Sequence, residues 1–291
     1  MERLRVESGG ERLDKFLAER VGVTRSQLKH AKILLNGKVV KSGTVLKAGD
    51  VIEVIAHYGG ARNEETKQSM PENIPLDIVF EDDWMMVINK HRGMVVHPGA
   101  GVKSGTLLNG LLGRGVDLER AGIVHRLDKN TAGLLVVAKT AEVQAKLAAM
   151  FERREVKRTY LGLVEGVLNG EGRIDKNIAR DPNRRTLYKT VVTGGRSAIT
   201  DYRVLRNFSK WTLVEFNLQT GRTHQIRVHA KSIGHPIVGD GEYNPSSSIK
   251  GLAGQMLESV ELGFVHPVSG KPVDFKIKPS EMFSKTVDRL V

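Results

Sequence analysis

The chain contains no cysteine among its 291 residues. This absence excludes disulfide bonds, thiolate zinc sites and cysteine nucleophiles, and it fits a reducing compartment. No run of about eighteen consecutive apolar residues occurs, so we expect no membrane-spanning helix. The first residues lack the apolar stretch of a signal peptide, and Glu2 and Glu7 argue against a transit peptide. We therefore expect a cytoplasmic protein.

Acidic residues are too few to balance the basic ones. The sequence has 45 Lys and Arg against 33 Asp and Glu, which gives a formal net charge of +12 at pH 7. Such an excess favours a polyanionic partner, although some soluble proteins are basic without one. Charge therefore indicates a class of partner and says nothing about chemistry.

Length and composition indicate a globular protein of two domains. The chain is longer than a usual single domain, and 40% hydrophobic residues suffice for a packed core. Residues 58–73 are polar, contain glycine and show no periodicity, which is typical of a linker. The sequence therefore predicts a small domain over 1–57, a linker over 58–73 and a larger domain over 74–291.

Helices followed by a hairpin are predicted in residues 1–57. The apolar spacing from Leu13 to Val21 predicts an amphipathic helix, and Thr24 would cap a second helix over 25–33. Asn36-Gly37 is a strong hairpin signal. The predicted strands are 33–35, 38–40 and 51–55.

Basic side chains gather in this small domain. Residues 21–49 include no acidic residue. On the predicted second helix, Arg25, Lys29 and Lys32 fall on one face, and Lys38 lies in the adjoining hairpin. A run of charge is usually a solvated face, but like charges on a helix and the next hairpin favour phosphate contacts.

Residues 11–55 resemble the S4 domain, a small RNA-binding module of ribosomal proteins and RNA-modifying enzymes. The likeness rests on Arg12-Leu13-Asp14-Lys15-Phe16-Leu17, Thr24-Arg25-Ser26-Gln27 and Asn36-Gly37-Lys38-Val39-Val40. It implies that the small domain binds RNA through cations that include Arg25, Lys29, Lys32 and Lys38.

Residues 74–291 contain many strand-like segments and few helices. One convincing helix begins at Thr140 and runs to about Arg153. Strands joined by hairpins, with the helices set apart from them, predict an α+β domain with a mixed, mostly antiparallel sheet. The predicted strands are 77–80, 85–89, 134–138, 159–164, 198–205 and 212–218.

A polar loop between two apolar segments is the first candidate for chemistry. An apolar strand over 122–124 leads into His125-Arg126-Leu127-Asp128-Lys129-Asn130, and a buried strand follows. Loops held by rigid elements often carry function. Arg126 and Lys129 flank Asp128 and would keep it ionised as a nucleophile. Local sequence alone leaves an equal alternative, an Asp that caps a turn between two surface cations.

Four segments resemble, in order and spacing, the RluA family of pseudouridine synthases. They are Asn89-Lys90 to Gly99, His125-Arg126-Leu127-Asp128 to Gly133, Lys157-Arg158-Thr159-Tyr160, and Thr220 to His229 followed by Gly234 to Asp240. With an S4 domain in front, the likeness is greatest to the RluD-type branch, which acts on large-subunit ribosomal RNA. It implies the pseudouridine synthase fold and isomerisation of chosen uridines in structured RNA, without a cofactor.

The resemblance also implies roles for single residues. Asp128 would be the essential carboxylate, and Arg227 would pair with it. Tyr160 would pack against the target base and is a candidate for proton transfer. Arg126 would fill the space that the flipped uridine leaves. An aromatic face offsets part of the cost of flipping, because stacking is worth about 1–3 kcal/mol per base.

Arg227 also has a case from the residues around it. Thr223 would cap a helix that runs to about Ile233 and ends at Gly234. Arg227 then lies near the start of this helix, where a charge that faces the protein is costly unless an anion matches it. A surface arginine is the alternative.

Further cations are candidates for contact with RNA. Arg184 and Arg185 lie in a turn-rich, arginine-dense loop that fits phosphate contacts, with a plain solvated loop as the alternative. Arg222 and His224, within the last of the four segments, are expected to contact RNA as well.

Other functions have less support. His224, His229 and His235 lack the carboxylates or motif of a metal site, so we expect no bound metal. No strand–helix unit with a distal acid follows residues 99–101, which disfavours a nucleotide site and a methyltransferase. The alternatives that remain are a non-catalytic RNA-binding or ribosome-assembly factor and a synthase acting on tRNA. We expect a monomer that acts on large-subunit ribosomal RNA or a pre-ribosomal particle.

Overall fold

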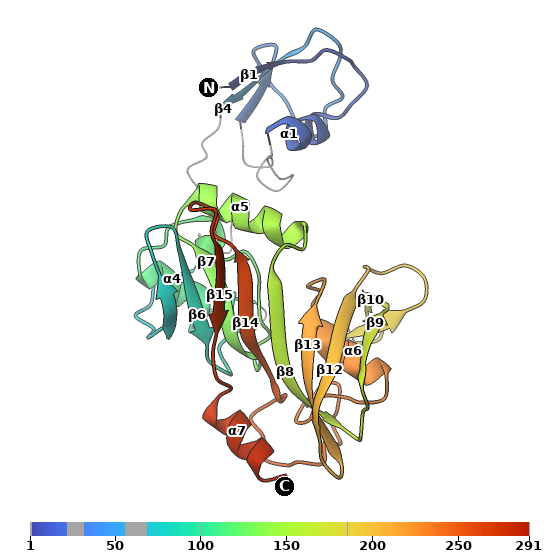
Figure 1. Cartoon of the computed structure of the whole chain (residues 1–291). Coiled ribbons are helices and arrows are strands. Elements are labelled where there is room, and N and C mark those ends of the chain that lie inside the picture. Colours follow the sequence, from blue (N-terminus) through green and yellow to red (C-terminus); the bar gives the residue numbers. More distant parts are fainter. Residues whose placement is uncertain (1, 22–31, 56–68, 100, 185, 291) are drawn as a thin grey trace. The chain divides into compact units, whose positions relative to one another are not determined.

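The computed structural model describes residues 2–21, 32–55, 69–99, 101–184 and 186–290. The chain divides into two compact units, each with a sheet of its own (Figure 1). The first comprises Met1–Lys67 with Asp117–Arg120, and the second comprises Gln68–Val116 and Ala121–Val291. Most of the predicted linker lies outside the described residues. No helix in the described part of the chain is long and apolar enough to cross a membrane.

The first unit is built on a four-stranded antiparallel sheet. Its described elements are β1 (Glu2–Arg5), α1 (Leu13–Val21), β2 (Lys32–Leu35), β3 (Lys38–Val39) and β4 (Val51–Ile55). The strands lie in the order β1-β4-β2-β3. Leu13, Phe16 and Leu17 of α1 share a buried core with Ile33 of β2 and Ile52 of β4. The apolar face of the helix therefore covers the sheet.

The sequence predicted α1 and the hairpin of this unit, but it missed β1 and misplaced the end of the second helix. The ends of α1 are the predicted ones, and Asn36 and Gly37 turn the hairpin with φ values of 52° and 77°. The helix predicted over 25–33 lies outside the described residues as far as residue 31. Its end is wrong, because Lys32 and Ile33 belong to β2, where Ile33 pairs with Val54. The S4 assignment stays a prediction.

A nine-stranded sheet dominates the second unit. Its strands are β5 (Ile78–Glu81), β6 (Met85–Lys90), β7 (Ala132–Ala138), β8 (Lys157–Glu165), β9 (Glu171–Asp175), β12 (Ile199–Asn207), β13 (Trp211–Leu218), β14 (Leu257–Val265) and β15 (Pro272–Lys276). Their order is β5-β6-β7-β14-β8-β13-β12-β9, with β15 also paired to β14. Of the described pairings only β7 with β14 is parallel, which confirms the predicted α+β class and mixed, mostly antiparallel sheet.

The parallel pair lies in the middle of this sheet. Ala132 and Gly133 of β7 are opposite Glu258 and Ser259 of β14. A Cβ on Gly133 would lie 2.1 Å from the carbonyl oxygen of Ser259, and the φ of Gly133 is 112°. Both conditions require glycine. Gly133 therefore allows β7 and β14 to pair directly after the loop that contains Asp128.

Helix α5 (Ala141–Glu152) packs on strands of the sheet. Its N-cap is Thr140, whose hydroxyl accepts a hydrogen bond from the Val143 amide, and its C-cap is Arg153. Val143 and Leu147 lie in one buried cluster with Leu134 and Val136 of β7. The predicted ends of this helix, Thr140 and Arg153, are its two caps. Apolar spacing and capping thus located the helix from sequence.

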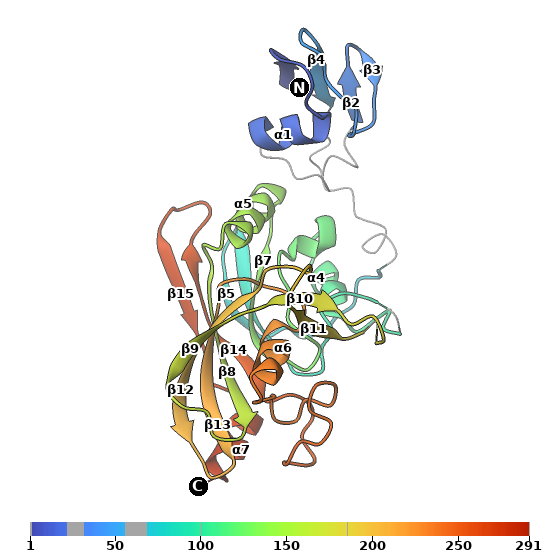
Figure 2. The same cartoon turned by 90° about the vertical axis from the view of Figure 1, so that its right-hand side faces the viewer.

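The other elements add a second layer to part of this unit. They are α4 (Leu107–Gly113), the hairpin of β10 (Asn177–Arg180) and β11 (Tyr188–Val191), α6 (Gln225–Ser232) and the C-terminal α7 (Glu281–Asp288). Figures 1 and 2 show α6 and the β10–β11 hairpin on the same face of the sheet. Ile178 of β10 and Val228 of α6 share a buried cluster with Ala198 and Tyr243.

Candidate active site

The loop that carries Asp128 connects a short helical turn to β7. The turn is a 3-10 helix, η1 (Glu119–Gly122), and Ile123 makes a single antiparallel bridge to Val137. The prediction of a strand over 122–124 is therefore wrong. Arg120, Ala121 and Gly122 have φ values of 53°, 49° and 73°, which no strand adopts.

His125 anchors the start of this loop. Its Nε2 accepts a hydrogen bond of 3.0 Å from the backbone N–H of Val136, and its ring stacks on Phe151 with centroids 4.4 Å apart. Burial, and to a lesser degree the Arg158 cation, lowers the pKa of His125 to about 3. The imidazole is therefore neutral at pH 7, with its proton on Nδ1. Its role in the motif is structural.

This histidine makes stability depend on pH. The folded-state pKa of about 3 lies below the usual 6.5, so from pH 6.5 down to 3 the unfolded chain gains a proton that the folded chain does not. The contribution of neutral His125 to the free energy of unfolding is fully present above pH 6.5 and is lost as the pH falls toward 3. We expect His125 to account for a loss of about 2 kcal/mol between pH 7 and pH 5.

His125→Gln is the variant that tests this dependence, because its side-chain oxygen still accepts a hydrogen bond but does not titrate. Urea unfolding at pH 7, 6 and 5 should show a smaller loss of unfolding free energy in the variant than in the wild type. Equal losses in the two proteins would show that His125 is not the titrating group.

Asp128 meets Arg227 at the end of the loop. Nη1 of Arg227 lies 3.2 Å from Oδ2 of Asp128, and their side chains are 4% and 16% exposed. Asp128 therefore has access to solvent, while its partner is buried. The two residues are 99 apart in sequence, and the predicted pair is brought together.

Helix α6 positions Arg227, but it begins differently from the prediction. Its N-cap is His224, at a φ of 57° and without a side-chain capping bond, so the assignment of Thr223 as the cap is wrong. The side chain of Gln225 closes the turn instead. It accepts from the Arg222 amide at 2.9 Å and from the Thr220 hydroxyl at 2.8 Å.

Two further carboxylates hold the Arg227 guanidinium. Asp240, fully buried, accepts from Nε at 2.7 Å and from Nη2 at 2.8 Å, and Glu242 accepts from Nη2 at 2.5 Å. Although burial opposes it, the hydrogen bonds and charge of Asp240, with the charges of Asp128 and Glu242, raise the pKa of Arg227. Arg227 is thus fixed in place and permanently charged. The sequence indicated Asp240 only as the last residue of a motif and gave it no role.

Lys90 is a second site residue to which the sequence assigned no role. It is 1% exposed, and Nζ donates to the carbonyl oxygens of His91 at 3.0 Å, Met94 at 3.0 Å and Lys129 at 3.2 Å. Three acceptors match the three protons of an ammonium group. Burial lowers the pKa of Lys90 to about 7, against the opposing effect of Asp128. Lys90 therefore joins the segment 91–94 to the loop of Asp128.

We expect Lys90→Met to reduce kcat by roughly 100-fold, because a shift of about 1 Å in a catalytic group has an effect of that size. Unfolding free energy should fall by about 1–3 kcal/mol as buried carbonyls lose their donor. The matched control is Lys139→Met. Lys139 bonds to the Asp82 carbonyl and the Glu81 carboxylate, at the other end of β7. Wild-type turnover in Lys90→Met would contradict the assignment.

Tyr160 lies on β8, is 6% exposed, and is in register with Phe216 and Ser259 on the neighbouring strands. Burial raises the pKa of its phenol, as does the nearby carboxylate of Asp128, against the opposing effects of Arg158 and Ser259. Tyr160 therefore stays protonated at neutral pH, close to Asp128.

His224 lies between Asp128 and a tyrosine. Its Nε2 is 3.9 Å from Oδ1 of Asp128, and its Nδ1 shares a 2.8 Å hydrogen bond with the hydroxyl of Tyr243. Burial lowers the pKa of His224, although Asp128 raises it. A neutral imidazole therefore lies beside the carboxylate.

The other predicted RNA contacts are dispersed. Arg126 is exposed two residues before Asp128, Arg184 is exposed in the β10–β11 loop, and Lys38 is exposed in the first unit. Arg222 is partly buried and donates from Nε to the Ser197 carbonyl at 2.9 Å. Arg25, Lys29 and Arg185 lie outside the described residues, as does the side chain of Lys32.

The three histidines considered for a metal have separate partners. His229 bonds to Thr200 and the Lys176 carbonyl, and His235 bonds to the Glu165 carbonyl. Within the described ranges no group of three or more His, Asp or Glu residues is arranged to hold a metal ion.

Known proteins similar to this chain share one family description. A family model described as RNA pseudouridylate synthase matches residues 84–232. Ribosomal large subunit pseudouridine synthase D of Escherichia coli O6:H1 is 41% identical over 281 residues, which cover 90% of this chain and 85% of the relative. The protein of the same name from Vibrio parahaemolyticus is 40% identical over 298 residues, which cover 95% and 90%.

A solved structure agrees with the fold. Human RNA Pseudouridylate Synthase Domain Containing 1 superposes with a TM-score of 0.57 at 26% identity, over 72% of this chain and 85% of that chain. Fold and relatives define the class as an isomerase that converts uridine in RNA to pseudouridine. The chain belongs to the RNA pseudouridylate synthase family. The predicted fold and activity are confirmed at this level.

Proposed function

We propose that the chain isomerises uridines of large-subunit ribosomal RNA, with Asp128 as the nucleophile. The observation that carries this proposal is the 3.2 Å pair between a partly exposed Asp128 and a buried Arg227. The relatives described above are named as large-subunit enzymes and are 40–41% identical over most of the chain, which supports this choice of RNA.

The reaction needs only groups that this site supplies. The C1′–N1 bond of uridine breaks and a C1′–C5 bond forms, N1 gains a proton and C5 loses one, so no other reactant is consumed. A carboxylate serves either as a covalent nucleophile or to stabilise charge while the glycosidic bond breaks. Arg227 holds that carboxylate through Nη1 while Asp240 and Glu242 hold Arg227.

We propose that Tyr160 packs against the target base and that Arg126 fills the space that the flipped base leaves in the RNA. Burial and the charge of Asp128 keep the phenol of Tyr160 protonated, so its ring serves better for packing than as a base. Arg126 is exposed and two residues from the nucleophile, where it can enter the stack that the uridine leaves. These contacts offset part of the few kcal/mol that flipping costs.

We further propose that the first unit is an S4 domain that adds affinity for RNA, in a cytoplasmic protein that acts as a monomer. Support comes from the sequence pattern, and from Lys38, which is exposed on β3 next to the Asn36-Gly37 turn. Arg25, Lys29, Lys32, Arg184, Arg185, Arg222 and His224 stay candidates for RNA contacts.

The test is tritium release from RNA labelled at uridine C5, measured with large-subunit ribosomal RNA and tRNA in separate reactions. We expect release from ribosomal RNA and little from tRNA. Release from tRNA alone would replace the proposed substrate. No release from either RNA or from an assembling ribosomal particle would contradict the proposed function.

A further inference from the structure

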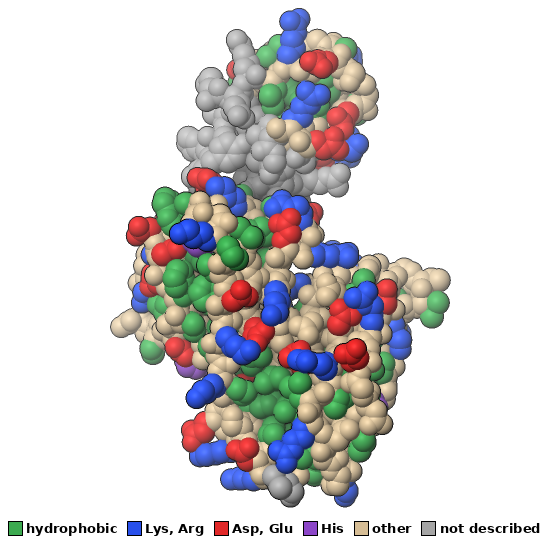
Figure 3. Space-filling model, in the orientation of Figure 1, with side chains coloured by type: hydrophobic (Ala, Val, Ile, Leu, Met, Phe, Trp, Pro, Cys, Tyr) green, Lys and Arg blue, Asp and Glu red, His purple; other side chains and the backbone are tan. Residues whose placement is uncertain are grey.

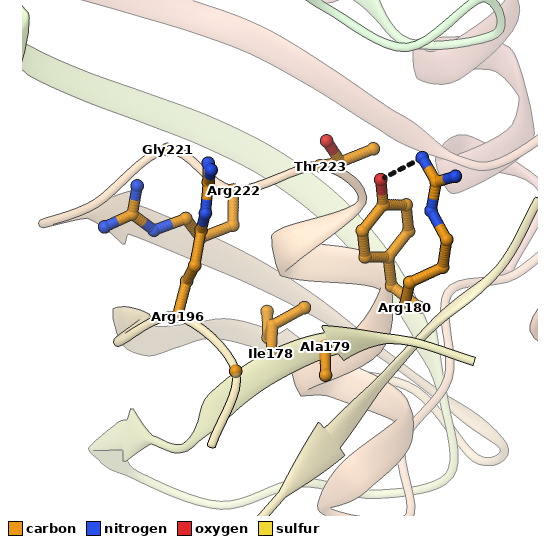
Figure 4. A pocket seen from close by; sticks show the side chains of 9 residues that line it. Ile178, Ala179, Arg180, Arg196, Gly221, Arg222 and Thr223 are labelled. Atoms are coloured by element: carbon orange, nitrogen blue, oxygen red, sulfur yellow. Dashed lines mark hydrogen bonds between the residues drawn. The ribbon is translucent and has the colours of Figure 1, made fainter. Parts of the chain in front are cut away.

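A pocket of about 500 Å³ lies between the β10–β11 hairpin and the segment that leads into α6. Its lining is Ile178, Ala179, Arg180, Tyr188, Gly195, Arg196, Gly221, Arg222 and Thr223. In Figure 4, Arg196 and Arg222 form one side, Thr223 and Arg180 the other, and Ile178 and Ala179 lie between them. The volume is within the range of about 300–1,000 Å³ typical of small-molecule sites.

The pocket is cationic, and its charges are not neutralised by the protein. Among the described residues, Arg180, Arg196 and Arg222 form no ion pair with a carboxylate. Arg180 donates to the Tyr188 hydroxyl, and Arg222 donates to the Ser197 carbonyl. Arg154, after α5, is near enough to act on Arg222 with Arg196, and both lower the pKa of Arg222 after burial. Three arginines from different segments therefore line one pocket.

Several cations elsewhere in the second unit are paired with carboxylates. Lys157 pairs with Glu261, Arg203 with Glu215, and Arg173 with Asp201, at 3.1, 3.1 and 2.6 Å. On the face shown in Figure 3, Lys and Arg side chains are interleaved with Asp and Glu. At the pocket, Arg180 and Arg196 are exposed and Arg222 is partly buried, so their guanidinium groups can bind an anion from outside the chain.

A buried arginine lies directly behind one wall of the pocket. Arg158 is 7% exposed, and a Cβ on Gly221 would lie 2.6 Å from its Nη1. Its Nε has no hydrogen-bond partner among the described residues, and its Nη2 makes a long 3.4 Å bond to the Leu218 carbonyl. Arg158 therefore adds a positive field behind a glycine wall that lets a ligand approach the backbone.

The aromatic wall connects the pocket to the catalytic carboxylate. The hydroxyl of Tyr188 accepts from Arg180 at 3.2 Å, drawn as the dashed line in Figure 4. The ring of Tyr188 meets the ring of His224 edge to face, with centroids 5.6 Å apart, and His224 is 3.9 Å from Asp128. Arg126 also acts on the Tyr188 phenol. The side chain of His224 thus lies between Tyr188 in the pocket wall and Asp128 in the reaction site.

We propose that this pocket binds a single unpaired nucleotide next to the target uridine, with its phosphate on Arg196 and Arg222 and its base on Tyr188. This inference rests on the proposed function, because the occupant is part of the same RNA. Guanidinium groups match phosphate oxygens in pairs, and aromatic rings stack on any base. The pocket therefore lets the enzyme take two successive nucleotides out of the RNA and identify its substrate by an unpaired neighbour.

The test combines RNA and protein changes. Wild type first locates the converted uridine in large-subunit ribosomal RNA, and a short fragment around it is made with an abasic nucleotide at each neighbouring position. At one of the two positions, kcat/KM of the wild type should fall roughly 10- to 100-fold, the value of one stacked base. Tyr188→Leu should lower kcat/KM on the intact fragment by the same factor. On the abasic fragment, kcat/KM of Tyr188→Leu should equal that of the wild type. Tyr188→Phe, which keeps the ring, should lose less kcat/KM than Tyr188→Leu and should keep the response to the abasic nucleotide.

The phosphate contact has a separate readout. In the Asp128→Asn background, log Kd is measured against log salt for the pair Arg196→Gln/Arg222→Gln and for the control pair Lys271→Gln/Lys278→Gln. Both control lysines are exposed, lie outside the pocket, and have the same summed charge. The arginine pair should reduce the slope by roughly 0.7 more than the control, as expected for one phosphate of a single strand.

The outcomes separate this inference from the function on which it rests. If the wild type isomerises the RNA but the effects of the abasic site and Tyr188→Leu simply multiply, the pocket assignment is overturned and the function stands. If no RNA is isomerised, the proposed function fails, and the salt slopes on ribosomal RNA decide the pocket alone. Equal slopes for the two pairs would then overturn it.

Discussion

Asp128→Asn is expected to lower isomerisation roughly 10³-fold or more while RNA affinity stays within about threefold, because loss of a nucleophile has effects of this order. Asparagine has the same shape but cannot attack as an anion. Arg227 keeps Asp240 and Glu242 as partners, at 2.7 and 2.5 Å, so the fold should persist. The loss should therefore be one of chemistry and not of folding.

Single-turnover tritium release with saturating enzyme measures the chemical step, and filter binding of the same RNA measures affinity. Asp83→Asn is the matched control, since Asp83 is an exposed carboxylate of the same unit. It should behave as wild type in both assays. Turnover of Asp128→Asn within tenfold of wild type would remove Asp128 from the role of nucleophile.

Asp240→Asn is expected to reduce the free energy of unfolding by about 3–5 kcal/mol, which is the cost of breaking a buried ion pair from one side. Asp240 is fully buried, and besides Arg227 it accepts from the backbone amides of Glu242 and Tyr243 at 3.1 and 3.0 Å. In Asp240→Asn, one of the two carboxylate oxygens that accept from Arg227 becomes an NH2 group, which is a donor and faces the donors of the guanidinium. Activity should fall as well, because Arg227 is then free to move relative to Asp128.

Glu242→Gln is the control for this prediction. Glu242 also contacts Arg227, but its side chain is 47% exposed, so its loss should cost less than about 1 kcal/mol. The double variant Arg227→Met/Asp240→Leu should recover much of the stability without recovering activity, since an apolar pair replaces a buried ion pair. Urea unfolding and tritium release measure the two effects. Equal destabilisation by Asp240→Asn and Glu242→Gln would contradict the assignment.

Local patterns located many of the regular elements. Helix α5 was placed to within its caps because Thr140 and the apolar spacing of Val143 and Leu147 are local signals. The six predicted strands of the large sheet all occur. The short strands β9 to β11 were missed, since sequences such as Asn177–Arg180 are polar and have no alternation.

Burial of polar groups was not visible in the sequence. Strand β14 was missed partly because it contains Glu258, which is 3% exposed and is matched by Arg92 at 3.2 Å and by the Ser280 hydroxyl at 2.6 Å. These partners come from distant positions in the chain. The same holds for Lys90, whose acceptors are backbone carbonyls.

In the candidate site too, motifs indicated some residues, while others could be recognised only from the fold. Motif residues indicated Asp128 and Arg227, whereas Asp240 as the second partner of Arg227 required the fold, because it follows α6 in an irregular segment. The arginine cluster of Arg154, Arg196 and Arg222 was also out of reach, since its members are separated by tens of residues and meet only in three dimensions.

The place of β14 in the sheet has a consequence for biosynthesis. Strands β5 to β7 and strands β8, β13, β12 and β9 meet in the sheet through β14, which is among the last strands to be made. Asp128 precedes β7 on one side, while Tyr160 belongs to β8 on the other. Before β14 has been made, the part of the site beside β7, with Asp128, and the part on β8, with Tyr160, are two half-sites. They are not yet held together in one sheet. The two half-sites are therefore made seconds before the strand that joins them, since a chain grows at about 5–20 residues per second.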